Sequence, residues 1–70
     1  MNFISVYVGK YENTSISKKD LKKLNELGLK GYLYSLGDYY SIKVASFPDN
    51  ERALKLKEVL EKKGFISFIN

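Results

Sequence analysis

The stretch VYVGKY, Val6–Tyr11, has a counterpart 36 residues later in IKVASF, Ile42–Phe47. Each copy is an apolar-polar-apolar run followed by a small residue, one further residue and an aromatic residue. Alternation with a period of two is typical of a β-strand that buries one face. The two copies therefore raise the question whether the whole chain is an internal repeat of one structural unit.

The same offset of 36 residues aligns the rest of the two halves. The identical pairs are Ser5 and Ser41, Val8 and Val44, Lys19 and Lys55, Leu24 and Leu60, and Gly28 and Gly64. Each half also has the same order of signals: an alternating run, a polar loop, a helical pattern, a glycine and a second short alternating run. Shared order as well as shared residues predicts strand-helix-strand twice, in half-repeats of about 3–35 and 39–70.

The local signals assign an approximate range to each element. We expect strands near 3–10, 30–35, 39–46 and 65–69, and helices near 18–27 and 50–63. Ser17 followed by Asp20 suggests a capping box at the first helix, and Asp49 or Asn50 begins the second. The apolar stripes expected to be buried are Leu21, Leu24 and Leu27 on the first helix, and Ala53, Leu56, Val59 and Leu60 on the second. A tight turn at Gly37-Asp38 joins the halves.

These elements predict a single α+β domain over residues 1–70. A βαββαβ chain built from two split β-α-β units forms a four-stranded antiparallel sheet with both helices on one face, the ferredoxin-like or RNP-like arrangement. Period two assigns one set of strand residues to the helices: Ile4, Val6, Val8, Leu29, Leu33, Tyr40, Ile42, Val44, Phe65, Ser67 and Ile69. The opposite set faces outward: Phe3, Ser5, Tyr7, Lys30, Tyr32, Tyr34, Tyr39, Ser41, Lys43, Ile66 and Phe68.

The outward set contains more aromatic rings than an open sheet face needs. Exposed apolar patches of this kind usually mark a binding surface. Tyrosine suits a sugar ligand because its ring stacks on sugar C–H groups and its hydroxyl forms hydrogen bonds. The predicted ligand-binding residues are Ser5, Tyr7, Tyr32, Tyr34, Ser41, Lys43 and Phe68. Tyr11 and Phe47, at the strand ends, are expected to close the core instead.

Composition argues against several other functions. The 70 residues contain no cysteine and no histidine, and the net charge is +4. Without a nucleophile-base pair, a glycine-rich phosphate loop or a metal-ligand cluster, we expect no catalysis, no cofactor and no metal site in this chain. No signal peptide is visible and no apolar run reaches the roughly 20 residues of a membrane span, so we expect no membrane insertion. Met1 directly before a strand suggests a domain of a longer protein.

The chain resembles the SPOR domain, the sporulation-related repeat of bacterial envelope proteins. The stretch GDYYSIKVASFPDNERALKLKEVLEKKGFISFI, 37–69, fits the family pattern of an alternating strand, a helix with spaced Ala and Leu, and a Gly-aromatic strand. The matching residues are Tyr40, Ile42, Val44, Ala45, Phe47, Ala53, Leu56, Leu60, Gly64, Phe65 and Ser67. In the first half they are Val6, Val8, Gly9, Tyr11, Leu24, Gly28 and Gly31.

The resemblance implies a non-catalytic module that binds peptidoglycan glycan strands stripped of their stem peptides. It further implies a monomer that targets a larger cell-wall hydrolase, division or sporulation protein to the bacterial cell envelope, with any catalytic domain elsewhere in that protein. Two positions depart from the family pattern. Tyr7 stands where many members carry a glutamine, and Lys10 stands where they carry a small hydroxyl residue.

Two alternatives share this architecture. An RNA-recognition domain also stacks single-stranded bases on its sheet, but DYYSIKVA lacks the basic-Gly-aromatic-small-aromatic signature. Most lysines also fall on the predicted helices among glutamates, so we expect no nucleic-acid partner. A regulatory module that binds a small molecule is the second alternative, and no residue of the sequence favours or excludes it.

Overall fold

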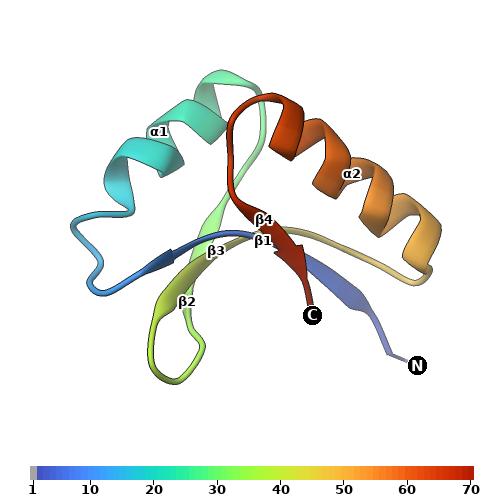
Figure 1. Ribbon diagram of the computed structural model, residues 1–70, viewed down its shortest axis with the longest axis horizontal. Helices are drawn as coiled ribbons and strands as arrows, with labels where there is room; N and C mark the ends of the chain where they lie inside the picture. The colour runs from blue at the N-terminus through green and yellow to red at the C-terminus, as the bar shows by residue number, and fades with distance from the viewer. Residues whose placement is uncertain (1) are drawn as a thin grey trace.

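The computed structural model describes residues 2–70 and contains the six elements that the sequence predicts. They are β1 (Ile4–Tyr11), α1 (Lys18–Glu26), β2 (Tyr32–Ser35), β3 (Tyr40–Phe47), α2 (Asn50–Lys62) and β4 (Ser67–Ile69) (Figure 1). Every boundary lies within two residues of its predicted position. Met1 lies outside the described residues.

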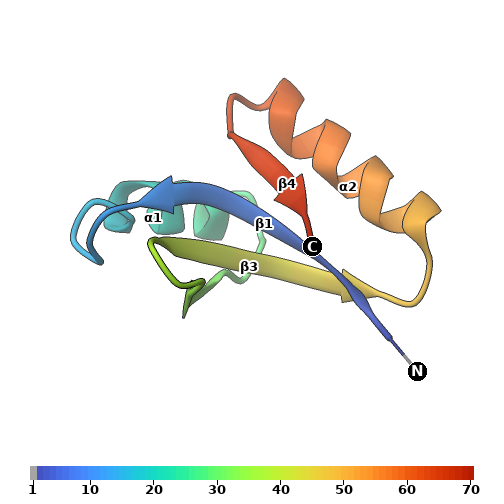
Figure 2. The ribbon, with the colours of Figure 1, turned by 60° about the horizontal axis from the view of Figure 1, so that its bottom comes forward.

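The four strands form one sheet in the order β2-β3-β1-β4, and each neighbouring pair is antiparallel. Both helices lie on the same side of this sheet and diverge from each other (Figures 1 and 2). The predicted α+β fold with a βαββαβ order is therefore confirmed. Because the helices cover one face, the opposite face of the sheet, here called the open face, is left without a covering layer.

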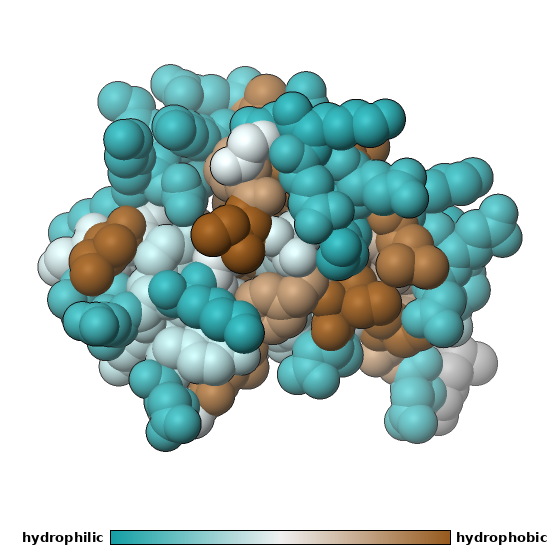
Figure 3. Space-filling model, viewed as in Figure 1, coloured by the Kyte–Doolittle hydropathy of each residue, from teal (hydrophilic) through white to brown (hydrophobic). Residues whose placement is uncertain are grey.

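The core lies between the helices and the sheet. Val6, Val8 and Ile42 from the central strands are fully buried, and so are Leu24 of α1 and Leu60 of α2. The helical surface outside this layer is mainly hydrophilic (Figure 3). Two expectations about the helices were wrong, since Leu27 and Val59 are both exposed. Both residues lie toward the C-terminal ends of the helices, so the predicted stripes extend beyond the surface that the sheet can cover.

The helix ends show that the two halves are copies in three dimensions as well. Gly28 after α1 and Gly64 after α2 have positive φ angles of 80° and 93°. Leu24 accepts a backbone hydrogen bond from Leu29 at 2.9 Å, and Leu60 accepts one from Phe65 at 3.0 Å. These bonds are those of a Schellman motif, in which the chain turns back so that an apolar residue packs against the last helical turn. Each helix thus ends by the same device.

The helix starts differ. Asp49, one of the two residues predicted to begin the second helix, caps α2, and its side chain accepts from the backbone N–H of Arg52 at 3.0 Å. Ser17 stands at the N-cap position of α1, but its hydroxyl donates to the carbonyl of Thr14 at 2.7 Å and caps no helical N–H. The predicted capping box is therefore wrong. Asp20 instead accepts a 2.6 Å hydrogen bond from the hydroxyl of Tyr11.

Both central strands carry a bulge, and the two bulges lie within one residue of equivalent points of the repeat. The register of β1 with β3 shifts between Val6 and Tyr7, where Val44 of β3 is the extra residue, and again between Val8 and Tyr11. At the second shift Gly9 has a φ of 75°. Glycine is the residue that adopts this backbone conformation without a steric cost.

The bulges reverse the alternation of side chains that period two predicts. After Gly9, Lys10 turns to the open face and the Tyr11 ring joins the core. After Val44, Ser46 pairs with Ser5 on the open face while Phe47 packs against the core. The small residue in VYVGKY and IKVASF therefore marks the point where each strand changes the face that it buries. Tyr11 and Phe47 close the core as expected.

The Gly9 bulge gives a prediction about stability. A Cβ at Gly9 would overlap the Tyr11 ring, whose hydroxyl is held by Asp20, whereas a Cβ at Gly37 (φ 86°) would meet no atom within 4 Å. Gly37→Ala then carries only the backbone cost of about 1 kcal/mol, and Gly9→Ala adds an overpacking cost, for a total of roughly 2–4 kcal/mol. Urea unfolding of both variants measures the difference. Equal losses would show that the ring moves aside freely.

A second prediction concerns alkaline pH. Burial and the hydrogen bond to Asp20 raise the pKa of Tyr11 well above its usual value of 10.0. Above that usual value the unfolded chain releases the Tyr11 proton while the folded protein retains it, so the free energy of unfolding falls as pH rises. We expect a steeper loss of stability above about pH 10 in the wild type than in Tyr11→Phe, which cannot titrate. Parallel losses in the two proteins would contradict this assignment.

Candidate functional site

A row of side chains crosses the open face from one edge of the sheet to the other. Phe68 of β4 lies beside Tyr7 of β1, Tyr7 beside Lys43 of β3, and Lys43 beside Tyr32 of β2. Neighbouring strands lie about 4.8 Å apart, so the row spans roughly 14 Å. The structure therefore brings four of the predicted ligand-binding residues into one line, which we call the transverse row.

Exposure varies strongly along the transverse row. Tyr32 is 58% exposed, Lys43 and Phe68 are half-buried, and Tyr7 is only 8% exposed. Tyr7 is buried because its ring stacks on Phe68, with centroids 5.5 Å apart and planes 16° apart. The expectation that Tyr7 stands free on the open face is wrong, since neighbouring side chains cover it. Tyr7 therefore packs within the row and presents little of its ring to solvent.

Ser5 and Ser41 were predicted to bind the ligand, and the structure assigns them other contacts. Ser41 is fully buried, and its hydroxyl donates to the carbonyls of Val8 at 3.2 Å and Gly9 at 2.7 Å. Ser5 is also buried, and its hydroxyl is bonded to that of Ser46 at 2.9 Å. Ser41 therefore holds the Gly9 bulge in place. Its hydroxyl is not free for a ligand, and this part of the prediction is corrected.

The rings that remain available lie on the edge strand β2. Tyr32 and Tyr34 are 58% and 45% exposed and point to the same face, because they are two residues apart. We call them the exposed tyrosine pair. Lys43 of the neighbouring strand places its Nζ 5.3 Å from the centroid of the Tyr34 ring. A cationic group therefore sits beside two rings that a ligand can reach from solvent.

Sequence reasoning did not assign Lys10 and Tyr39 to the site. Lys10 Nζ lies 5.2 Å from the ring centroids of both Tyr39 and Phe68, and these two rings meet edge to face at 6.4 Å. Simple alternation places Lys10 on the helical face with Val6 and Val8. Its true position follows from the bulge, and an isolated glycine within a strand pattern was the available signal.

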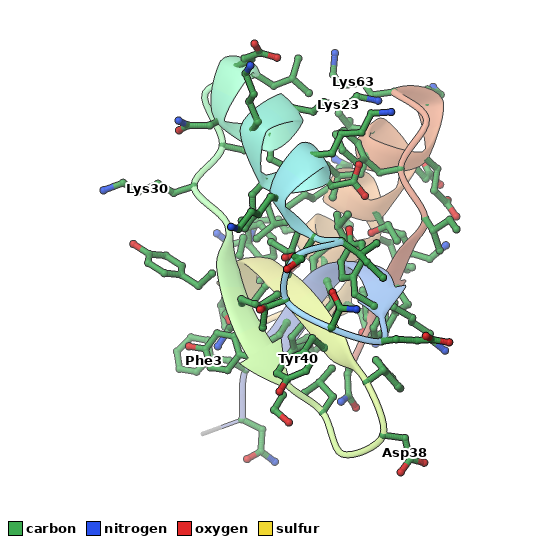
Figure 4. All side chains as sticks on the ribbon, turned by 90° about the vertical axis from the view of Figure 1, so that its left-hand side faces the viewer. Phe3, Lys23, Lys30, Asp38, Tyr40 and Lys63 are labelled. Carbon is green, nitrogen blue, oxygen red and sulfur yellow. The ribbon has the colours of Figure 1, made fainter. Side chains whose placement is uncertain are left out.

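Two hollows of the molecular surface lie near the helices instead. One is lined by Leu21, Lys22, Asn25, Lys30 and Gly31 beside α1, and the other by Lys23, Glu26, Leu27, Lys63 and Phe65. The second lies where the C-terminal ends of the helices approach, and Figure 4 shows Lys23 and Lys63 at that end, far from Phe3 on the opposite side. The Lys30 side chain extends away from the molecule. Neither hollow includes a predicted ligand-binding residue.

The chemistry available on the open face is stacking, hydrogen bonding and attraction of anions. The four strands contain no Asp, Glu, His or Cys, and their charged residues are Lys10 and Lys43. Within residues 2–70, no three potential metal-ligating side chains of these types come together. No helix in this part of the chain has the length and apolarity to span a bilayer.

No family model matches the chain, and comparison with curated proteins and with solved structures finds no match. The resemblance to the SPOR family therefore rests on the residues quoted above and stays a prediction.

The burial of Tyr7 generates a prediction that separates support from contact. We expect Tyr7→Ala to lower the free energy of unfolding by roughly 3 kcal/mol, because truncation of a buried aromatic ring leaves a cavity and removes its stacking partner. Tyr32→Ala removes an exposed ring and should cost less than about 1 kcal/mol. Urea unfolding monitored by circular dichroism compares the two. A near-neutral Tyr7→Ala would show that the ring is not buried in solution.

Proposed function

We propose that the open face binds an extended carbohydrate chain, and that this chain is a glycan strand of the bacterial cell wall. The observation that carries the proposal is the exposed tyrosine pair with Lys43 beside it. Two free rings about 7 Å apart along one strand suit a polymer of rings better than a compact ligand. The two hollows described above lie beside the helices, so the proposed ligand lies across the strands and not inside either hollow.

Each group in this part of the site has a role in such binding. The rings of Tyr32 and Tyr34 stack on the C–H faces of sugar rings, and their hydroxyls add hydrogen bonds at a small entropic cost. The Lys43 ammonium group donates to ring substituents or pairs with a carboxylate. Since the strands hold no carboxylate or imidazole, the proposal is binding and not hydrolysis.

The cell-wall assignment draws on the resemblance to the SPOR family. On that basis the chain is a non-catalytic targeting module of a larger envelope protein, such as a wall hydrolase or a division or sporulation protein. Glycan strands stripped of stem peptides would be its ligand. The open face supports this by offering stacking surfaces with no carboxylate that would repel the acidic wall.

Single-stranded nucleic acid is the competing ligand, because it too combines stacking with negative charge. The burial of Tyr7 argues against it. The Tyr7 ring on a central strand already stacks on Phe68, so a base cannot use the ring face that Phe68 covers. The exposed rings of Tyr32 and Tyr34 lie at the edge of the sheet. Only a short segment of a nucleic acid could stack on them there.

The test is binding of the chain to purified cell-wall sacculi, before and after amidase treatment, and to glycan oligomers released from them. We expect Tyr32→Ala and Tyr34→Ala each to weaken binding by about 1 kcal/mol, roughly fivefold, while the melting temperature stays within a few degrees. Amidase treatment should increase the amount bound. Moderate salt should weaken binding only slightly, since stacking is not screened.

Leu54→Ala is the matched control, because Leu54 is 45% exposed, as Tyr34 is, but lies on α2 in the helical layer. It should leave binding unchanged. A single-stranded RNA oligomer is the competitor. Tighter binding to RNA with a steep dependence on salt would replace the glycan by a nucleic acid. Sacculi that retain none of the wild-type chain would overturn the proposal.

A further inference from the structure

The Gly9 bulge does more than close the core, because it places a cation on the open face. In an unbroken strand Lys10 would share the face of Val6 and Val8 and would bury its charge among apolar side chains. The bulge turns Lys10 outward, where it is exposed to solvent. Ser41 holds this geometry through its bonds to the carbonyls of Val8 and Gly9. The position of the Lys10 ammonium group is therefore set by the fold.

The surroundings of Lys10 hold the ammonium group without neutralising it. Its Nζ lies at 5.2 Å from the centroids of both Tyr39 and Phe68, within the range of a cation–π interaction. Within residues 2–70, the three ion pairs are Asp49–Arg52, Glu51–Lys55 and Lys57–Glu61, all on α2 or at its N-cap. Lys10 has no carboxylate partner among them. Aromatic rings fix the side chain while its charge and N–H donors stay available.

The charges of the whole chain are separated in the same way. None of the eight Asp and Glu residues falls in a strand, and they lie in the helices, at the N-cap of α2 or in loops. The helical layer therefore carries both signs, whereas the strands carry only Lys10 and Lys43. None of the three ion pairs within residues 2–70 involves Lys10 or Lys43. The open face is consequently the surface that repels an anion least.

We propose that Lys10, with the rings of Tyr39 and Phe68, forms a second subsite that binds a carboxylate carried by the glycan. This inference rests on the proposed function and adds a charge requirement to it. A single ammonium group matches a monoanionic carboxylate better than a doubly charged phosphate monoester. The sugar that bears the carboxylate packs against the edge of Phe68. The rest of the glycan lies along the transverse row and reaches the exposed tyrosine pair.

Two soluble hexasaccharides test the charge requirement. Chitohexaose is neutral, and hyaluronan hexasaccharide carries a carboxylate on alternate rings with similar amino sugars between them. We expect the wild-type chain to bind the acidic oligomer about three- to fivefold more tightly, the range of an exposed charge pair. Amide shifts of Lys10, Tyr39 and Phe68 should change with the acidic oligomer and much less with the neutral one.

The variants separate charge from packing. Lys10→Gln should bring the affinity for the acidic oligomer down to that for the neutral one and leave the neutral one unchanged. Lys10→Arg, which keeps the charge and stacks on rings, should restore the preference. Lys23→Gln is the control, because it removes the same charge from the far end of the helical layer (Figure 4). It should change neither affinity.

The outcomes are distinguishable from a failure of the proposed function. If the wild type binds both oligomers equally and Lys10→Gln changes neither, the subsite is overturned and glycan binding stands. If neither oligomer nor sacculi bind, both proposals fail together. A single-stranded RNA oligomer is the remaining comparison. If it binds more tightly than both sugars and Lys10→Gln lowers that affinity, Lys10 binds a phosphate of the RNA backbone and the carboxylate subsite is overturned.

Discussion

A tyrosine ring packed against a glycine in the middle of β1 sets the geometry on which the rest of the structure depends. Tyr11 can reach the core only because Gly9 adopts a positive φ and leaves room for the ring. The hydroxyl of Tyr11 then reaches Asp20 at the start of α1 and ties the strand to the helix. Ser41 of the neighbouring strand secures the bulge from the other side. One backbone irregularity thus joins β1, β3 and α1.

This constraint also shapes the open face. A regular β1 would show solvent only Phe3, Ser5, Tyr7 and residues in step with them. The bulge adds Lys10 between Tyr39 and Phe68, and the equivalent bulge on β3 adds Ser46 beside Ser5. The cost of a lost ladder hydrogen bond in each central strand is offset by the burial of Tyr11 and Phe47. In both central strands, the same bulge therefore buries an aromatic residue in the core and turns a polar residue to the open face.

The crowding of the open face divides its aromatic residues into two kinds. On the central strands a ring has neighbours on both sides, so Tyr7 stacks on Phe68 and loses its contact with solvent. On the edge strand β2 a ring has a neighbour on one side only, so Tyr32 and Tyr34 stay exposed. Position in the sheet order, more than residue type, decides which tyrosines can meet a ligand. A binding surface at the edge suits a polymer that extends beyond the domain.

The sequence by itself determined the number, order and type of the elements. Its repeated signals are local: alternation in VYV and IKV, the helical spacing of Leu24 and Leu60, and the glycines at 28 and 64 that end both helices. The outward assignment of Tyr32, Tyr34 and Lys43 also followed from period two. What only the tertiary structure decided was where that period breaks and which outward side chains remain accessible. A bulge depends on the register between two strands 36 residues apart, and the burial of Tyr7 depends on Phe68 at the other end of the chain. The failure of Ser17 as a cap is local, because its hydroxyl donates to the carbonyl of Thr14 three residues earlier, while Asp20 accepts from Tyr11.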